Sequence, residues 1–235
     1  METIDTGGVQ ELLGEGAQLV EVLPKADFDR EHLPGAISIP LPEMTEESVE
    51  RLDRSRPVIA YCYDHECDLS PRAAVWLEEL GFERAYDYTA SKVAWLAMGL
   101  PFEGTDGPDT RAGARVGHPP TFTPDDDVAA LGSVFDDWPV AVVLSGDVVV
   151  GVVRPEVRSL AADTPLRRVL QPAPPSVRPS IPIDELASSM DRDGERWVLV
   201  TRLDGTWLGL VRRDQLEGDP VDGPQEDGGQ ADADG

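Results

Sequence analysis

Short apolar runs alternate with amphipathic stretches through the first hundred residues. Spacing of the apolar positions separates segments of helical period from short, continuous strand-like runs. The expected helices lie within residues 9–16, 46–54, 70–82 and 91–99, and the expected strands within residues 17–23, 36–40, 57–62 and 84–88. This order, with short connections, predicts an α/β domain over residues 1–104, with a parallel sheet flanked by helices.

The helix at residues 70–82 has marked ends. Ser70 is a natural N-cap, Pro71 suits the first helical position, and Gly81 favours termination. Trp76 and Trp95 occur at helical core spacing in their segments, so we expect both to pack in the core.

A second region follows residues 105–118, which are rich in glycine, proline and charge and predict a linker. Beyond them the chain holds a loose internal repeat of a helix, two strands around a tight turn, and a helix. The pattern predicts a smaller α+β tandem repeat, with units at about 119–165 and 166–218. Residues 219–235 are acidic and glycine-rich, which is typical of a disordered tail.

Composition narrows the classes of partner. Forty-five acidic and twenty basic residues give a formal net charge of -25, which disfavours nucleic acid and anionic membrane surfaces. Apolar runs are too short for a membrane helix, and the start of the chain lacks the layout of a signal peptide, so we expect a cytoplasmic protein. Two cysteines five positions apart suit reactive thiols in a reducing compartment better than a disulfide framework or a metal site.

Cys62 follows the most apolar strand and precedes the helix at residues 70–82. A thiol in such a loop lies near backbone N–H groups and a helix N-terminus, which favour a thiolate or persulfide anion. Cys67 is either a second, resolving thiol or a filler of the loop interior, and His65 either moves a proton or faces solvent. A phosphatase loop of the Cys-x5-Arg type is excluded, because Asp68 stands at the arginine position.

Four motifs carry a resemblance over residues 5–104. They are the turn HLPGAISIP, the segment YCYDHECDLSPRAA, the strand entry LGFERAY and the ending AWLAMGLP. In this order they resemble the rhodanese family. The resemblance implies that Cys62 accepts sulfur as a persulfide from a small donor or a protein thiol, with no cofactor required. Cys67, His65 and Ser70 are the candidate auxiliary residues.

The chain departs from the rhodanese pattern at three places. The cysteine loop carries three carboxylates where basic residues are common. Glu21-Val22-Leu23 replaces the usual Asp-x-Arg, and Ser91-Lys92-Val93 replaces the usual Gly-Gly before Ala-Trp. Nearby carboxylates raise a thiol pKa and repel anionic donors, so the loop weighs against fast catalysis.

The repeated half resembles a tandem pair of cystathionine-β-synthase (CBS) domains. The strongest match joins VRPSIPIDELASSM to WVLVTRLDGTWLGLVRRDQL. The resemblance implies a regulatory or dimerising module that binds an adenine nucleotide, although the acidic residue that holds ribose in that family is missing from both units. Arg154, Arg212 and Arg213 are the candidate phosphate ligands.

Two functions remain open from the sequence. One is a rhodanese-type sulfurtransferase that uses a Cys62 persulfide and carries a CBS pair for regulation or homodimer formation. The alternative is a non-catalytic redox sensor or interaction scaffold with the same two parts.

Overall fold

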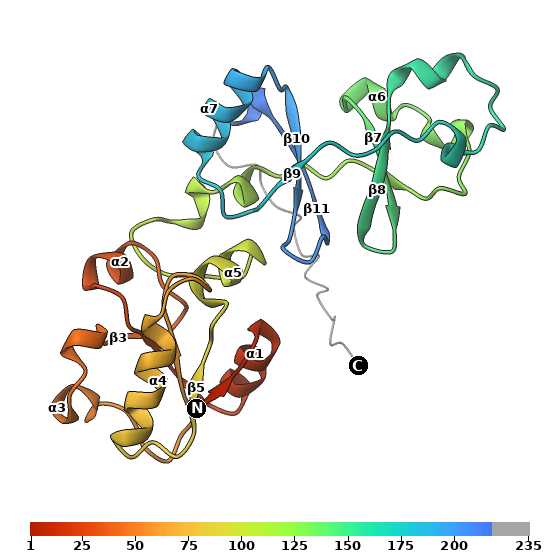
Figure 1. Ribbon diagram of the computed structural model, residues 1–235. Coiled ribbons are helices and arrows are strands. Elements are labelled where there is room, and N and C mark those ends of the chain that lie inside the picture. Colours follow the sequence, from red (N-terminus) through yellow and green to blue (C-terminus); the bar gives the residue numbers. More distant parts are fainter. Residues whose placement is uncertain (218–235) are drawn as a thin grey trace, which may run out of the picture.

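The computed structural model describes residues 1–217, and its first half is built on a five-stranded, wholly parallel sheet (Figure 1). The strand order is β1-β5-β4-β2-β3. The strands are β1 (Glu2–Thr3), β2 (Gln18–Glu21), β3 (Ile37–Ser38), β4 (Val58–Tyr61) and β5 (Ala85–Asp87). The expected α/β class is confirmed.

Helices cover both faces of this sheet. They are α1 (Thr6–Gly14), α2 (Lys25–Arg30), α3 (Glu46–Val49), α4 (Leu69–Glu79) and α5 (Ser91–Ala97). Val9 of α1 and Trp95 of α5 pack on one face with Ile59, while α3 and α4 pack on the other with Val58 and Ala60. Alternate residues of β4 therefore enter two separate core clusters, as the strand period requires.

Two short elements were missed by the sequence pattern, and one was overextended. Strand β1 has only two residues, too few to show a period. Helix α2 buries none of its side chains. It therefore has no apolar stripe, and the sequence pattern predicts a loop for this segment. The polar helix expected over residues 46–54 ends at Val49 in the structure.

Helix α4 begins earlier than expected, and its capping residue is different. Asp68 takes the N-cap position without a side-chain capping bond, and Ser70 lies inside the first turn, fully buried. Ser70 turns inward because its hydroxyl contacts the thiol of Cys62. The core expectation holds for Trp95 but not for Trp76, which is 46% exposed and donates from Nε1 to the carbonyl of Met44.

The second half contains two three-stranded units of one design. In each, a short strand pairs parallel with the first strand of an antiparallel hairpin. The first unit has β6 (Thr121–Phe122), α6 (Val134–Asp137), β7 (Ala141–Ser145) and β8 (Val148–Val153), and the second has β9 (Ser176–Val177), α7 (Ile183–Asp193), β10 (Trp197–Thr201) and β11 (Trp207–Arg212). The α+β tandem repeat predicted from the sequence is confirmed.

The two units are joined by reciprocal crossings at a pair of glycines. An added Cβ at Gly209 would lie 2.1 Å from Cγ1 of Val116, in the segment before the first unit. An added Cβ at Gly151 would lie 2.4 Å from the carbonyl oxygen of Gln171, in the segment before the second. The hairpin of each unit is therefore crossed by the segment that leads into the other unit. Only glycine, which has no Cβ, allows the two backbones to approach this closely.

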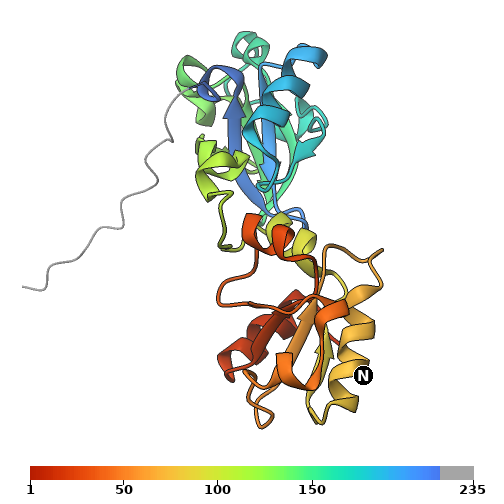
Figure 2. The same cartoon turned by 90° about the vertical axis from the view of Figure 1, so that its left-hand side faces the viewer.

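The segment expected to be a linker is partly built into the second unit. Ala112 is fully buried among Leu186, Met190 and Val200. Gly117 forms an antiparallel β-bridge with Leu210. Its glycine and proline content therefore reflects close backbone packing rather than freedom. Figure 2 shows the sheet domain at one end of the molecule and the paired units at the other, with α5 at the junction. The tail expected over residues 219–235 lies outside the described residues.

Candidate functional site

Cys62 lies directly after β4, at the carboxyl edge of the sheet, and is fully buried. Its Sγ is 3.3 Å from Oγ of Ser70, 3.5 Å from the carbonyl oxygen of Cys67 and 3.8 Å from that of Asp64. The two carbonyl oxygens accept from a neutral thiol and repel a thiolate, whereas the hydroxyl of Ser70 can rotate to donate to an anion. In this closed form the sulfur lies against two carbonyl oxygens and the hydroxyl of Ser70.

The side chain of Ser91 contacts both the backbone and the sulfur of Cys62. Its φ of 56° is positive, a conformation that costs about 1–2 kcal/mol in a non-glycine residue. Its Oγ accepts from the backbone N–H of Cys62 at 3.0 Å, donates to the carbonyl of Tyr88 at 2.8 Å and lies 3.6 Å from Sγ. The strained backbone places this hydroxyl under the thiol, where the rhodanese pattern has glycine.

Cys67 shares the loop with Cys62, and both are free thiols. Burial raises the pKa of Cys67 above its ordinary value, and the neighbouring Cys62 thiol raises it further. The backbone N–H groups of Leu69 and Tyr63 lower the pKa of Cys67 and so oppose both. The loop amides thus serve Cys67, whereas carbonyl oxygens surround Cys62.

The remaining polar residues of the loop face away from the thiol. His65 is exposed and lines a surface hollow with Thr89, and residues 1–217 contain no hydrogen bond between His65 and Cys62. Asp64 accepts from the backbone N–H of Glu66, and Asp68 lies 3.5 Å from Arg72. The structure therefore brings together Cys62, Cys67 and Ser70 of the predicted site, but not His65.

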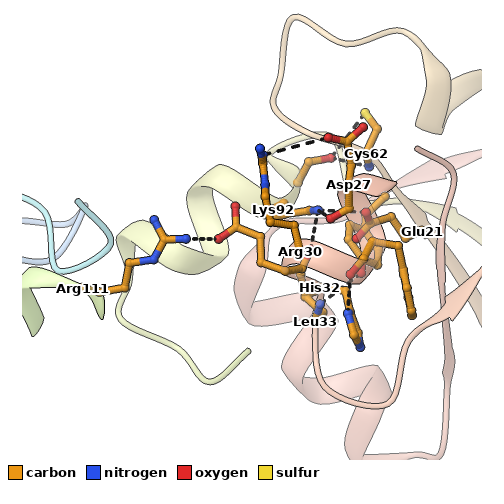
Figure 3. A network of polar contacts seen from close by, with 12 residues as sticks. Glu21, Asp27, Arg30, His32, Leu33, Cys62, Lys92 and Arg111 are labelled. Atoms are coloured by element: carbon orange, nitrogen blue, oxygen red, sulfur yellow. Dashed lines mark hydrogen bonds and ion pairs between the residues drawn. The ribbon is translucent and has the colours of Figure 1, made fainter. Parts of the chain in front are cut away.

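Two departures from the rhodanese pattern meet in the core. Nζ of Lys92 lies 2.8 Å from Oε1 of Glu21, and their side chains are 2% and 0% exposed (Figure 3). The same ammonium donates to the carbonyls of Glu31 and Asp27 at 2.6 and 3.3 Å. Burial raises the pKa of Glu21, and Lys92 opposes that rise. The backbone N–H of Lys92 also donates to the carbonyl of Cys62, at 3.4 Å.

An ion pair from the second half reaches this network. Arg111 donates from Nη2 to Glu31 at 2.6 Å, the dashed line at Arg111 in Figure 3. Its Nη1 donates to the carbonyl of Ser180 at 3.1 Å. The two side chains of the Arg111–Glu31 pair are 12% and 9% exposed. Glu31 therefore lies between the buried Lys92 and the paired units. The sequence pattern could not predict these contacts, because Lys92 and Arg111 lie 61 and 80 positions from Glu31 in the chain.

Of the three arginines expected to hold phosphate, two line one hollow and the third lies elsewhere. Arg212 and Arg213 line a hollow of about 750 Å³ between the two units, where they pair with Asp214 and Asp191. The lining of this hollow contains five carboxylates against three arginines. Arg154 does not line it and instead donates to the side chain of Gln171.

Comparison with known proteins assigns the part of the chain that holds Cys62. Residues 6–98 match the family model of the rhodanese-like domain. The N-terminal domain is rhodanese-like. A stretch of 102 residues is 33% identical to an HTH-type transcriptional regulator of Mycobacterium tuberculosis, covering 43% of this chain and 40% of that protein. The match therefore spans less than half of the relative.

Two solved structures are each similar to a part of this chain. A protein from Bacillus halodurans is 25% identical, with a TM-score of 0.41, over 45% of this chain and 79% of that one. The CBS domains of a transcriptional regulator from Streptococcus pneumoniae are 22% identical, with a TM-score of 0.41, over 46% and 96%. Within residues 1–217 no helix is long and apolar enough to cross a membrane.

Proposed function

We propose that the rhodanese-like domain carries sulfur as a persulfide on Cys62 and that the CBS-like pair regulates or dimerises the chain. The position of Cys62 supports this proposal most directly. The residue directly follows β4 and contacts Ser70 in the first turn of the eleven-residue α4. A helix N-terminus and a hydroxyl donor both stabilise an anionic sulfur.

The chemistry requires two displacements at sulfur. The Cys62 thiolate attacks the outer sulfur of thiosulfate, the S–S bond of the donor breaks, and sulfite leaves with the bonding electron pair. The Cys62 persulfide is then attacked at its terminal sulfur by cyanide or an acceptor thiolate, which takes that sulfur and releases the Cys62 thiolate. Splitting the transfer in this way replaces one difficult step by two easier ones.

The closed loop sets the expected rate and donor. Sγ of Cys62 is buried beneath the carbonyls of Asp64 and Cys67, so the loop must open before a donor can reach it. Acidic side chains at Glu66 and Asp68 repel thiosulfate, which is a dianion. We therefore expect slow turnover with thiosulfate and faster loading from a less charged persulfide donor.

Mass spectrometry of the intact chain tests the proposal. After incubation with glutathione persulfide, we expect one added sulfur on Cys62, removed by cyanide as thiocyanate. The C62S variant should take up none, and C67S, which keeps Cys62, is the matched control. If neither thiosulfate nor glutathione persulfide leaves a cyanide-labile sulfur on Cys62, the sulfur-carrier function is refuted.

A second function is favoured by the two thiols in one loop. One equivalent of hydrogen peroxide would take two electrons and two protons from Cys62 and Cys67, leaving a disulfide and two waters. The related stretch in an HTH-type transcriptional regulator agrees with such a sensing role. A mass loss of two hydrogens that needs both cysteines would support a redox sensor, and overoxidation of one cysteine without a disulfide would exclude it.

For the CBS-like pair, the geometry supports self-association over phosphate binding. Arg212 and Arg213 already pair with carboxylates, whereas Val148 and Val150 on β8 and Leu160 are exposed. We expect ATP and AMP to leave the melting temperature unchanged, and light scattering to give twice the chain mass. A nucleotide-dependent rise in melting temperature would instead support an adenine-nucleotide sensor.

A further inference from the structure

A second cavity, of about 490 Å³, lies at the junction of the rhodanese-like domain and the second CBS-like unit. Leu96 and Leu100, in and just after α5, form one wall. Val116 and Leu208 form the other. The contact between the domains is close here, since the N–H of Leu203 donates to the carbonyl of Ala97 at 3.1 Å. This cavity is separate from the Cys62 loop and from the hollow that Arg212 lines.

The ionisable side chains of the lining are all basic. The polar side chains are Arg111, His118, Ser180 and Arg202, and none of the carboxylates within residues 1–217 lines the cavity. In a chain of net charge -25, a cavity without acidic residues is a local reversal of the surface charge. Such a reversal attracts anions by direct Coulomb interaction.

Arg202 has capacity for a ligand. Among residues 1–217 its guanidinium forms no ion pair, and its buried Nε has no hydrogen-bond partner. Buried N–H donors such as this Nε are normally satisfied, because an unmet donor costs about 1–3 kcal/mol. The Nε of Arg111 is also without a partner, but Glu31, Asp106 and the carbonyl of Ser180 occupy the terminal nitrogens of Arg111, and its Cζ lies 5.7 Å from the Phe102 ring centre.

We propose that this cavity binds a small amphipathic anion. Its aromatic or aliphatic body lies between Leu96 and Leu208, and its carboxylate, sulfonate or phosphate group pairs with Arg202. The volume falls in the range of about 300–1,000 Å³ found for small-molecule sites, which are mostly apolar with a few placed polar groups. Guanidinium is the side-chain group best suited to pair with these head groups.

Binding here would couple the two halves of the chain. One wall belongs to α5, whose first residues Ser91 and Lys92 lie beneath Cys62, and the other belongs to the CBS-like unit. A ligand that touches both walls binds only the docked arrangement, so it favours that arrangement by mass action. The ligand would hold α5 in place and thereby act on the thiol loop.

The probe for this site is 1-anilinonaphthalene-8-sulfonate, with N-phenyl-1-naphthylamine as the matched neutral compound. Fluorescence titration of the full chain should give one sulfonate probe per chain. R202Q should weaken it about tenfold, as expected for the loss of a charge-assisted bond, and should leave the neutral compound unchanged. R154Q removes an exposed arginine of the other unit and should change neither affinity.

Hydrogen exchange locates the site independently. The bound sulfonate probe should slow exchange in residues 96–102 and 111–118 together. Equal affinity of the wild type and R202Q for the sulfonate, binding of several probes per chain, or protection confined to one of the two segments would each overturn the proposal.

Discussion

The buried pair of Lys92 and Glu21 makes the most demanding prediction for stability. Lys92 donates three hydrogen bonds, one to the Glu21 carboxylate and two to the carbonyls of Asp27 and Glu31. Replacing Lys92 by Met removes all three donors and leaves a fully buried carboxylate without its cation. Breaking one side of a buried ion pair typically costs about 3–5 kcal/mol, a large part of the roughly 5–15 kcal/mol that holds a domain folded.

The loss should depend on pH in a defined direction. The folded pKa of Glu21 lies above its ordinary value of 4.5, so the folded chain binds this proton more tightly than the unfolded chain. The free energy of unfolding contributed by Glu21 is therefore greatest below pH 4.5 and falls as the pH rises through the folded pKa. In K92M the opposing effect of the ammonium is gone, so the folded pKa rises and this decline extends to higher pH.

Urea denaturation of the full chain, followed by tryptophan fluorescence at several pH values, measures this effect. K25M is the matched control, because Lys25 is the only other lysine and its ion pair with Asp29 is exposed. The double variant E21L/K92M removes both charges and should recover most of the lost stability. A loss below about 1 kcal/mol in K92M, or an equal loss in K25M, would refute the assignment of a structural ion pair.

Three further predictions concern the backbone and the domain junction. G209A should destabilise the second unit by several kcal/mol in urea denaturation because its Cβ has no space, whereas G14A, with no atom within 4 Å of the added Cβ, should be neutral or slightly stabilising. S91A should lose more stability than S91G, since both lose the hydroxyl but only glycine relieves the positive φ; equal melting temperatures would contradict this. Replacing Arg111 and Glu31 by alanine, singly and together, should give a coupling energy of about 1–3 kcal/mol in a double-mutant cycle, and additivity would remove the pair as a link between the domains.

The sequence predicted those helices and strands in which the apolar positions follow a clear pattern or a glycine marks the end of the element. The strand at β4 and the helix at α4 were found because their apolar positions are continuous or regularly spaced, and Gly81 terminates α4 with a φ of 88°. The helix start was wrong because Ser70 has two uses: the side chain that could cap a helix instead contacts a buried thiol. Local capping preference cannot account for a partner eight residues away.

The candidate site was only partly predictable for a related reason. Cys62 was located by its neighbours in the chain, but the Lys92–Glu21 pair was visible only as two separate departures from a family pattern. The backbone of β2 and the turn into α5 bring those residues together across 71 positions. Pairing of this kind is decided by the sheet order, which places β2 beside β4 and β4 beside β5.

The same sheet order explains why these departures bear on the thiol. Glu21 ends β2, Cys62 follows β4, and Ser91 and Lys92 follow β5, so all four residues lie at the carboxyl edge of one parallel sheet. The hydroxyl of Ser91 accepts from the backbone N–H of Cys62, a bond that a glycine at this position could not make, and it adds to the backbone bond from Lys92 N–H to the carbonyl of Cys62. A firmly held edge slows the opening that a buried thiol needs before it reacts. Under the proposed function the substitutions that separate this edge from the rhodanese pattern therefore predict slower opening of the Cys62 loop, and the contact of Glu31 with Arg111 links the same edge to the paired units.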